Sequence, residues 1–289
     1  MEKSNVKPAE GKLGILCVGL GAVSSTFING TLMIRKGLGV PVGSITQLAK
    51  IRVGKGADAQ YKHVSEIVSM PTLDDIVFGA WDILPDNAFE SSMHAEVLRD
   101  RDIYPVKDEL EKIVPMKGVY DPNYVKALEG TWVKDPKATR WELMEQVRED
   151  IRNFKEKNGC SRIVVIWAAS TEIYVPRFAA VHDDLDAFEA AMKADDREHI
   201  SPSMCYAYAA LAEGAPFIMG APNTCLDFPA MWQFAEKTQM PIAGKDFKTG
   251  QTMMKTVFVS SIPHPHARCK RMVLNQHSWQ PRRFGTRRA

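Results

Sequence analysis

The feature that most constrains the fold is a glycine turn between a short apolar run and a helix near the N-terminus. Residues 13–18 read L-G-I-L-C-V, Gly19 and Gly21 follow at once, and residues 24–34 have the pattern of a helix. An apolar run that ends in a glycine turn is typical of a buried parallel strand. The sequence therefore predicts a strand, a tight turn and a helix, which is how many open α/β sheets begin.

The rest of the chain alternates between strands and helices in the same way. Strands are predicted at 75–81, 163–168, 216–220 and 242–243, and helices at 86–101, 107–113, 121–129, 139–158, 184–193, 203–213, 226–238 and 249–255. The helix over 139–158 has the clearest pattern, with one apolar face and a left-handed cap signal at Gly159. Residues 43–72 are Gly-rich and polar, and they are expected to form an irregular connection. This alternation predicts a doubly wound, parallel-sheet α/β fold of the Rossmann type.

Composition narrows the class of protein. The longest purely apolar stretch, residues 163–169, is far shorter than the ~20 residues of a membrane helix. The N-terminal residues lack the apolar core of a secretory signal, so a cytoplasmic protein without a membrane partner is expected. The five cysteines are dispersed and never form C-x-x-C, which argues against a disulfide framework and a thiolate zinc site. No metal site is predicted.

The turn V-G-L-G-A-V-S, residues 18–24, fits a dinucleotide site. Gly19 allows a tight turn, Gly21 lets a pyrophosphate approach the backbone, and the helix start supplies N–H donors. Ser24 stands where the fingerprint has its third glycine, and a small side chain still permits close packing of helix on strand. The alternative is an ordinary strand–helix turn.

Polar residues also end the next two long strands. Asp82 follows the run at 75–81, where a carboxylate can bind ribose hydroxyls and repel a 2′-phosphate, which favours NAD over NADP. Its distance from Gly19 is much longer than usual, and a helix N-cap is the alternative. Ser170 and Thr171 follow the run at 163–168, where they can line a cofactor crevice or cap a helix.

The last motif is lysine-rich. Residues 244–255 read G-K-D-F-K-T-G-Q-T-M-M-K, with three lysines and one aspartate. Lysines near a helix start can bind phosphate, and a desolvated lysine can carry protons. A solvated basic loop fits the composition equally well.

Taken in order, these segments resemble the myo-inositol-phosphate synthase family over about residues 13–255. The motifs that carry the resemblance are Gly19-Leu20-Gly21, Gly79–Ile83, Val165–Glu172, Gly220–Thr224 and Asp246–Thr252. Met253 stands where many eukaryotic members have lysine, so the chain is similar to the prokaryotic branch. The family carries out an NAD-dependent isomerisation of glucose 6-phosphate to inositol phosphate, in inositol and phospholipid biosynthesis.

The resemblance implies a role for each motif. Oxidation at C5, enolisation, an intramolecular aldol closure and re-reduction all place negative charge on oxygen, and lysines stabilise such charge. Lys248 and Lys255 are therefore expected to be catalytic, and Asn223, Thr224 and Lys245 to bind substrate. The cofactor-binding residues expected are Gly19, Gly21, Ala22, Val23, Asp82, Ser170, Thr171 and Asp246.

The C-terminal residues depart from the family. Residues 256–289 hold one lysine, six arginines and no acid, so the first 255 residues have a net charge of −5. Codons that permit residues 272–284, read one nucleotide later, give W-F-S-T-N-I-L-G-N-R-D-G, which resembles a segment of the family's second domain. A polar leader is thus expected at 1–12, the NAD-binding domain at 13–255, and a frameshifted, disordered basic tail at 256–289.

Family members form homotetramers through an α+β second domain that is largely missing here, so this chain is expected neither to tetramerise nor to be active. Two other functions stay open. One is an NAD-dependent sugar-phosphate or hydroxy-acid dehydrogenase, which would release NADH in proportion to substrate. The other is a non-catalytic NAD-binding or nucleic-acid-binding protein that uses its basic tail, although no nucleic-acid partner is expected if the tail arises from a frameshift.

Overall fold

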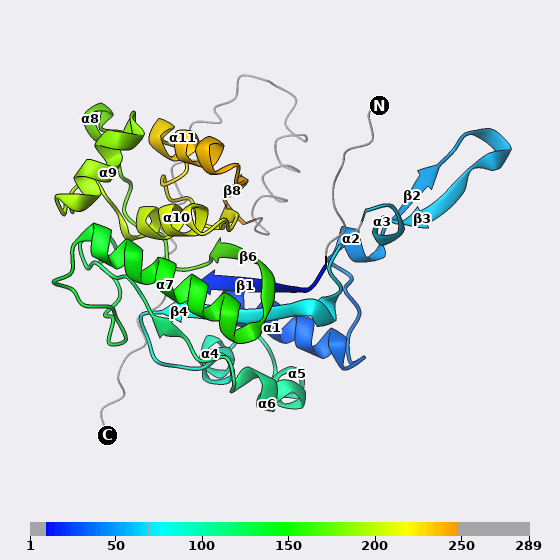
Figure 1. Ribbon diagram of the computed structural model, residues 1–289. Coiled ribbons are helices and arrows are strands. Elements are labelled where there is room, and N and C mark those ends of the chain that lie inside the picture. Colours follow the sequence, from blue (N-terminus) through cyan, green and yellow to red (C-terminus); the bar gives the residue numbers. More distant parts are fainter. Residues whose placement is uncertain (1–9, 69, 248–289) are drawn as a thin grey trace, which may run out of the picture. The chain divides into compact units, whose positions relative to one another are not determined.

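The centre of the molecule is a six-stranded parallel sheet with the strand order β5-β4-β1-β6-β7-β8 (Figure 1). The computed structural model describes residues 10–68 and 70–247. The strands are β1 (Lys12–Val18), β4 (Ile76–Asp82), β5 (Met116–Lys117), β6 (Cys160–Trp167), β7 (Phe217–Met219) and β8 (Ile242–Gly244). This is the strand order of a doubly wound dinucleotide-binding fold, which confirms the predicted fold class.

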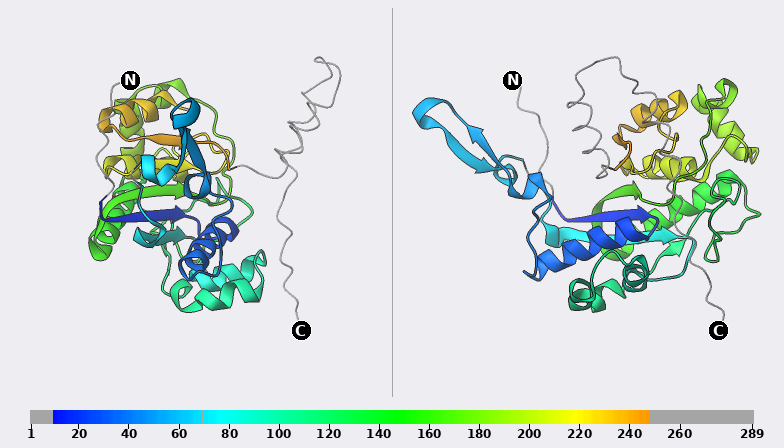
Figure 2. Two further views of the ribbon diagram at one scale, coloured as in Figure 1. Left: turned by 90° about the vertical axis from the view of Figure 1, so that its right-hand side faces the viewer. Right: turned by 180° about the vertical axis from the view of Figure 1, so that it is seen from behind.

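Helices cover both faces of the sheet (Figure 2). One layer holds α1 (Ala22–Arg35), α4 (Ala88–Ala95), α5 (Asp100–Ile103) and α6 (Lys107–Leu110). The other holds α7 (Arg140–Asn158), α9 (Leu185–Lys193), α10 (Pro202–Ala212) and α11 (Pro229–Thr238), and α8 (Ala179–His182) precedes α9. Successive residues of a strand point to opposite faces of the sheet, and each face has its own apolar core. Leu16 of β1 packs in the core with α7 and α10, and Cys17 packs in the core with α1 and α4. The sheet is therefore buried on both faces, as its apolar strands require.

Helix α7 matches its prediction to within one residue. Thr139 caps its start, with the Thr139 hydroxyl accepting from the Glu142 N–H and the Glu142 carboxylate accepting from the Thr139 N–H. Gly159 ends it in the left-handed conformation, at φ +62°. Met144, Val147 and Ile151 are buried on one face. A strong apolar face and two cap signals fix this element locally.

Two predictions of local structure are wrong. Residues 43–72 are not irregular, since they contain α2 (Ile45–Leu48), an antiparallel hairpin of β2 (Lys50–Val53) and β3 (Gln60–His63), and α3 (Val64–Ile67). Residues 121–129 form turns instead of a helix. Asp121 there makes a buried ion pair with Arg140, and the Tyr124 hydroxyl donates to the carbonyl of Arg197. Both side chains thus contact residues that lie far along the chain.

Smaller differences concern element ends. The predicted helix 86–101 is interrupted after α4, where Glu96 adopts φ +52°. Helix α11 starts at Pro229 rather than near residue 226 because the proline takes the first helical position. The described residues also contain three short 3-10 helices, at Gly56–Asp58, Leu73–Asp75 and Tyr104–Val106. The predicted helix at 249–255 lies outside the described residues.

Candidate functional site

The carboxyl ends of the strands form the edge at which the predicted site residues gather. The chain runs from β1 outward to β4 and β5, then returns to β6 beside β1 and runs outward to β7 and β8. In open α/β sheets, ligands bind in the crevice at this reversal of strand order. The predicted residues from Gly19 to Asp246 all lie at or soon after strand ends.

Gly19 holds the turn between β1 and α1 against the neighbouring strand β6. Its φ is +91°, and a Cβ on it would lie 2.5 Å from the Cα of Ala169. Its N–H donates to the carbonyl of Trp81 at 2.8 Å. The Ser24 hydroxyl, fully buried, donates to the Gly19 carbonyl at 2.6 Å. Only glycine fits at position 19, because any side chain would meet backbone.

Gly21 has a different environment. A Cβ built on it meets no atom of the described residues within 4 Å, and Gly21, Ala22 and Val23 are all exposed. Among the described residues, no side chain caps α1 at Gly21, and the first turn contains no acid. The start of α1 is therefore exposed and carries the positive end of the helix dipole, which makes it a favourable place for an anion such as a pyrophosphate.

Asp82 links the glycine turn to strand β4. Its Oδ2 accepts from the N–H of Leu20 at 2.5 Å, and its Oδ1 accepts from the N–H of Leu84 at 3.0 Å. Burial raises the pKa of Asp82, and these backbone N–H groups act in the opposite direction. The N-cap alternative is wrong, because the next helix starts at Ala88 and Asn87 caps it. Each carboxylate oxygen retains a lone pair, so the group can still accept from ribose hydroxyls.

The loop after β6 carries Ser170 and Thr171, both exposed. The helix-cap alternative is wrong here as well, since the next helix, α8, begins at Ala179. The neighbouring Glu172 is only 6% exposed, and its carboxylate accepts from the N–H and the hydroxyl of Ser203. Glu172 was not among the predicted site residues. Its position after Ser-Thr at a strand end was the one local signal for it.

The loop after β7 places Asn223 and Thr224 against the β6 loop. The side-chain oxygen of Asn223 accepts from the N–H of Glu172 at 3.2 Å. The Thr224 hydroxyl donates to the carbonyl of Val175 at 3.1 Å. Both residues are buried. These two predicted residues therefore lie against the loop that contains Ser170. One polar group of each residue joins the loop after β7 to the loop after β6.

The segment after β8 holds the remaining predicted residues. The Lys245 ammonium forms an ion pair with Asp227 and donates to the carbonyl of Asn223 at 3.2 Å. Asp246 is exposed. Lys248 and Lys255 lie outside the described residues.

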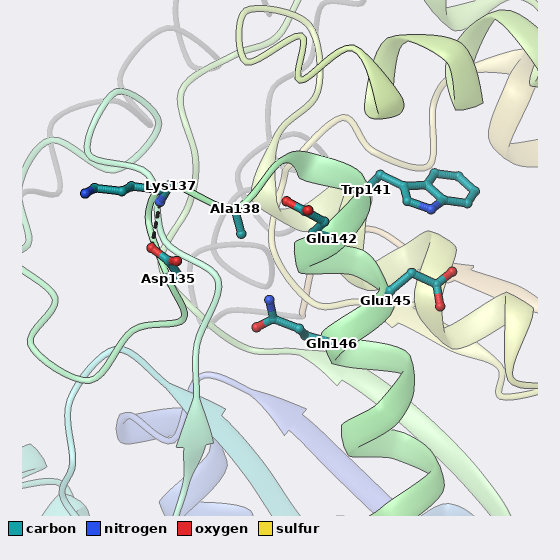
Figure 3. A pocket seen from close by; sticks show the side chains of 7 residues that line it. All are labelled: Asp135, Lys137, Ala138, Trp141, Glu142, Glu145 and Gln146. Carbon is teal, nitrogen blue, oxygen red and sulfur yellow. Dashed lines mark hydrogen bonds between the residues drawn. The ribbon is translucent and has the colours of Figure 1, made fainter.

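A surface hollow of about 480 Å³ lies elsewhere, on the first two turns of α7 and the loop before them (Figure 3). None of the predicted site residues lines it. Two of its carboxylates are engaged by backbone, since Asp135 accepts from the N–H of Lys137 and Glu142 accepts from that of Thr139. The described residues contain no group of three or more His, Cys, Asp or Glu side chains that could hold a metal. Within the same residues, no helix has the length and apolar character needed to span a membrane.

The chain is similar to several known proteins. An NAD-binding family model described as myo-inositol-1-phosphate synthase matches residues 13–274. Inositol-3-phosphate synthase 1 of Bacteroides thetaiotaomicron is 57% identical over 256 residues, which are 88% of this chain and 58% of that protein. Inositol-3-phosphate synthase 1 of Oryza sativa subsp. japonica is 37% identical over 262 residues, which are 86% of this chain and 51% of that protein.

A solved structure is similar as well. The crystal structure of inositol-3-phosphate synthase from Caenorhabditis elegans superimposes with a TM-score of 0.79 at 28% identity, over 88% of this chain and 53% of that one. The chain thus spans about half the length of the relatives it matches. With the family model matching most of its length, the chain belongs to the myo-inositol-1-phosphate synthase family, and its Rossmann-type part is that family's NAD-binding domain.

Proposed function

We propose that this chain provides the cofactor half of an inositol-3-phosphate synthase that isomerises glucose 6-phosphate to inositol phosphate. The observation that carries the proposal is the open start of α1 above Gly21, beside Asp82, in a chain of this family. When bound, NAD supplies reversible hydride transfer, so the substrate is oxidised early and reduced again at the end. The net reaction then releases no NADH.

Residues from the two halves of the sheet bind different parts of the ligands. The N–H groups at Gly21, Ala22 and Val23 hold the pyrophosphate, and Asp82 accepts from the ribose hydroxyls. Ser170, Thr171 and Asp246 line the other half of the crevice. Asn223, Thr224 and Lys245 bind the sugar phosphate. The Lys245 ammonium exchanges Asp227 for the phosphate, which is a suitable partner because it also carries negative charge.

Lys248 and Lys255 are proposed to stabilise the oxygen anions of enolisation and ring closure, and to move protons at those oxygens. Both roles need a cation close to the sugar. In the sequence, Lys248 lies four residues and Lys255 eleven residues after Gly244, where β8 ends. We therefore expect each to contribute to the chemical step.

A chimera tests this proposal. Residues 1–255 of this chain are joined to the remaining sequence of the Bacteroides thetaiotaomicron relative, and inositol phosphate and NADH are measured with glucose 6-phosphate and NAD. Turnover without net NADH is expected. Lys248→Ala and Lys255→Ala should each lower the rate by about 100- to 1,000-fold, as for loss of a charge-stabilising donor in an enclosed site.

Lys237→Ala is the matched control, because Lys237 is exposed in the last turn of α11. It should leave the rate unchanged. Accumulation of one NADH per substrate would instead identify a dehydrogenase. If both lysine variants kept near-parent turnover, the proposed role of these lysines in the chemical step would be wrong.

A further inference from the structure

Glu172 is a buried carboxylate in the loop after the carboxyl end of β6, and neither the family resemblance nor the predicted site gives it a role. It follows the two exposed residues Ser170 and Thr171 in the loop after β6. Its Oε1 accepts from the N–H of Ser203 at 2.8 Å, and its Oε2 accepts from the Ser203 hydroxyl at 2.5 Å. A carboxylate is costly to bury, so a group retained there needs such partners.

These contacts cap helix α10 from outside the helix. Pro202 occupies the first helical position, and the side chain of the N-cap residue Ser201 makes no capping hydrogen bond to the helix. The Glu172 carboxylate accepts from the N–H of Ser203 instead of the Ser201 side chain, and the positive end of the helix dipole favours the charge of Glu172. Burial raises the pKa of Glu172, while Ser203 and the nearby Arg140 act in the opposite direction. The loop after β6 is thereby fixed to the start of α10.

The backbone of Glu172 extends the same connection to the next loop. Its N–H donates to the side-chain oxygen of Asn223, and the Asn223 carbonyl accepts from the Lys245 ammonium. Loops that leave β6, β7 and β8 are therefore joined in series. All three belong to the second half of the sheet, whereas the glycine turn and Asp82 belong to the first.

We propose that Glu172 is a positioning residue that holds the loops after β6 and β7 in the shape needed by the nicotinamide half of NAD. A dinucleotide lies across the switch point with one mononucleotide on each half of the sheet. The adenosine diphosphate part should then contact the glycine turn and Asp82, and it should not depend on Glu172. This inference rests on the proposed placement of NAD.

The test compares two ligands on the full chain. Affinities for NAD and for ADP are measured by calorimetry for the parent, Glu172→Ala and Glu172→Gln, together with thermal midpoints. Glu172→Ala should weaken NAD on the order of tenfold and leave ADP within about twofold, because only the nicotinamide half loses its support. Glu172→Gln should restore most of the NAD affinity, since an amide can still accept from the Ser203 N–H.

Two further variants keep the test decisive. Ser203→Ala removes one donor to the carboxylate while retaining the helix. It should lower the NAD affinity by less than Glu172→Ala does, and it should leave the ADP affinity unchanged. Glu213→Ala is the control, because this carboxylate lies at the opposite end of α10 and pairs with Arg148 and Arg152. It should lower the thermal midpoint and leave the ratio of NAD to ADP affinity unchanged.

Equal losses of NAD and ADP affinity in Glu172→Ala would overturn the inference, because they would indicate a merely structural role. An unchanged affinity ratio in both Glu172→Ala and Ser203→Ala would overturn it too. If the parent binds ADP and NAD normally in those cases, the proposed function stands. If the parent binds neither ligand, the proposed function fails together with this inference.

Discussion

At the scale of single residues, Gly19 and Gly21 are glycines for different reasons. Gly19 needs a positive φ and lies against Ala169, whereas Gly21 has open space around its missing Cβ. The Gly21→Val variant should therefore fold normally, with an unchanged thermal midpoint, and should lose at least about tenfold in NAD affinity because the new side chain meets the pyrophosphate. Calorimetry and thermal unfolding measure the two quantities.

Gly30→Ala serves as the control for this prediction. Gly30 lies inside the same helix α1, and a Cβ on it would likewise have no neighbour within 4 Å among the described residues outside its own helical turns. Alanine there should stabilise the protein by about 0.5–1 kcal/mol and leave NAD affinity unchanged. Equal NAD affinity in Gly21→Val and the parent would show that the pyrophosphate does not lie above Gly21.

His182 gives a second prediction at this scale. It is fully buried, stacks on Phe228 at 4.0 Å, and its Nδ1 accepts from the N–H of Phe178 at 3.0 Å. Nε2 therefore carries the proton and donates to the His199 carbonyl. Burial lowers the pKa of His182, although Asp183 and Asp196 nearby act in the opposite direction. The folded protein thus disfavours the protonated imidazole.

The sign of the pH effect follows from linkage. Because the unfolded chain binds the proton more readily, this contribution to stability is present above about pH 6.5 and falls as the pH decreases toward the lowered folded pKa. The free energy of unfolding of the parent should fall more steeply from pH 7 to pH 5 than that of His182→Gln. Urea titrations at several pH values measure it, with the exposed His94→Gln as control. Parallel pH profiles for parent and His182→Gln would contradict the assignment.

At the scale of elements, helix α7 is stabilised at its start by the reciprocal bonds of Thr139 and Glu142. Thr139→Ala should lower the free energy of unfolding by about 1 kcal/mol, because the N–H of Glu142 loses its acceptor. Glu149→Ala, on the exposed face of the same helix, should change it by less than about 0.5 kcal/mol. Denaturant midpoints compare the two variants, and similar losses in both would argue against the cap.

The same helix explains which elements could be predicted from the sequence. Its apolar face and caps lie within one window of residues, so local pattern was sufficient. The helix predicted at 121–129 was wrong in a segment whose Asp121 pairs with Arg140 outside that window. Glu172 was missed because its partners Ser203 and Asn223 are 31 and 51 positions away. The hairpin of β2 and β3 was missed because its strands are short and mostly exposed, which leaves a weak alternation. Contacts that form only in the folded chain leave no local pattern to read.

At the scale of the whole molecule, the two halves of the sheet meet between β1 and β6, and NAD is expected to bind across that junction. A ligand that binds only the folded protein stabilises it, by about 2.7 kcal/mol at 100 times its Kd. NAD at that concentration should therefore raise the thermal midpoint by several degrees. NADP at the same concentration should raise it less, because its 2′-phosphate would approach the Asp82 carboxylate. A tenfold loss of affinity in Gly21→Val should reduce the NAD shift by about half, and a larger loss should reduce it further. Equal shifts with NAD and NADP would mean that Asp82, which is held by Leu20 and Leu84, does not face the adenosine ribose.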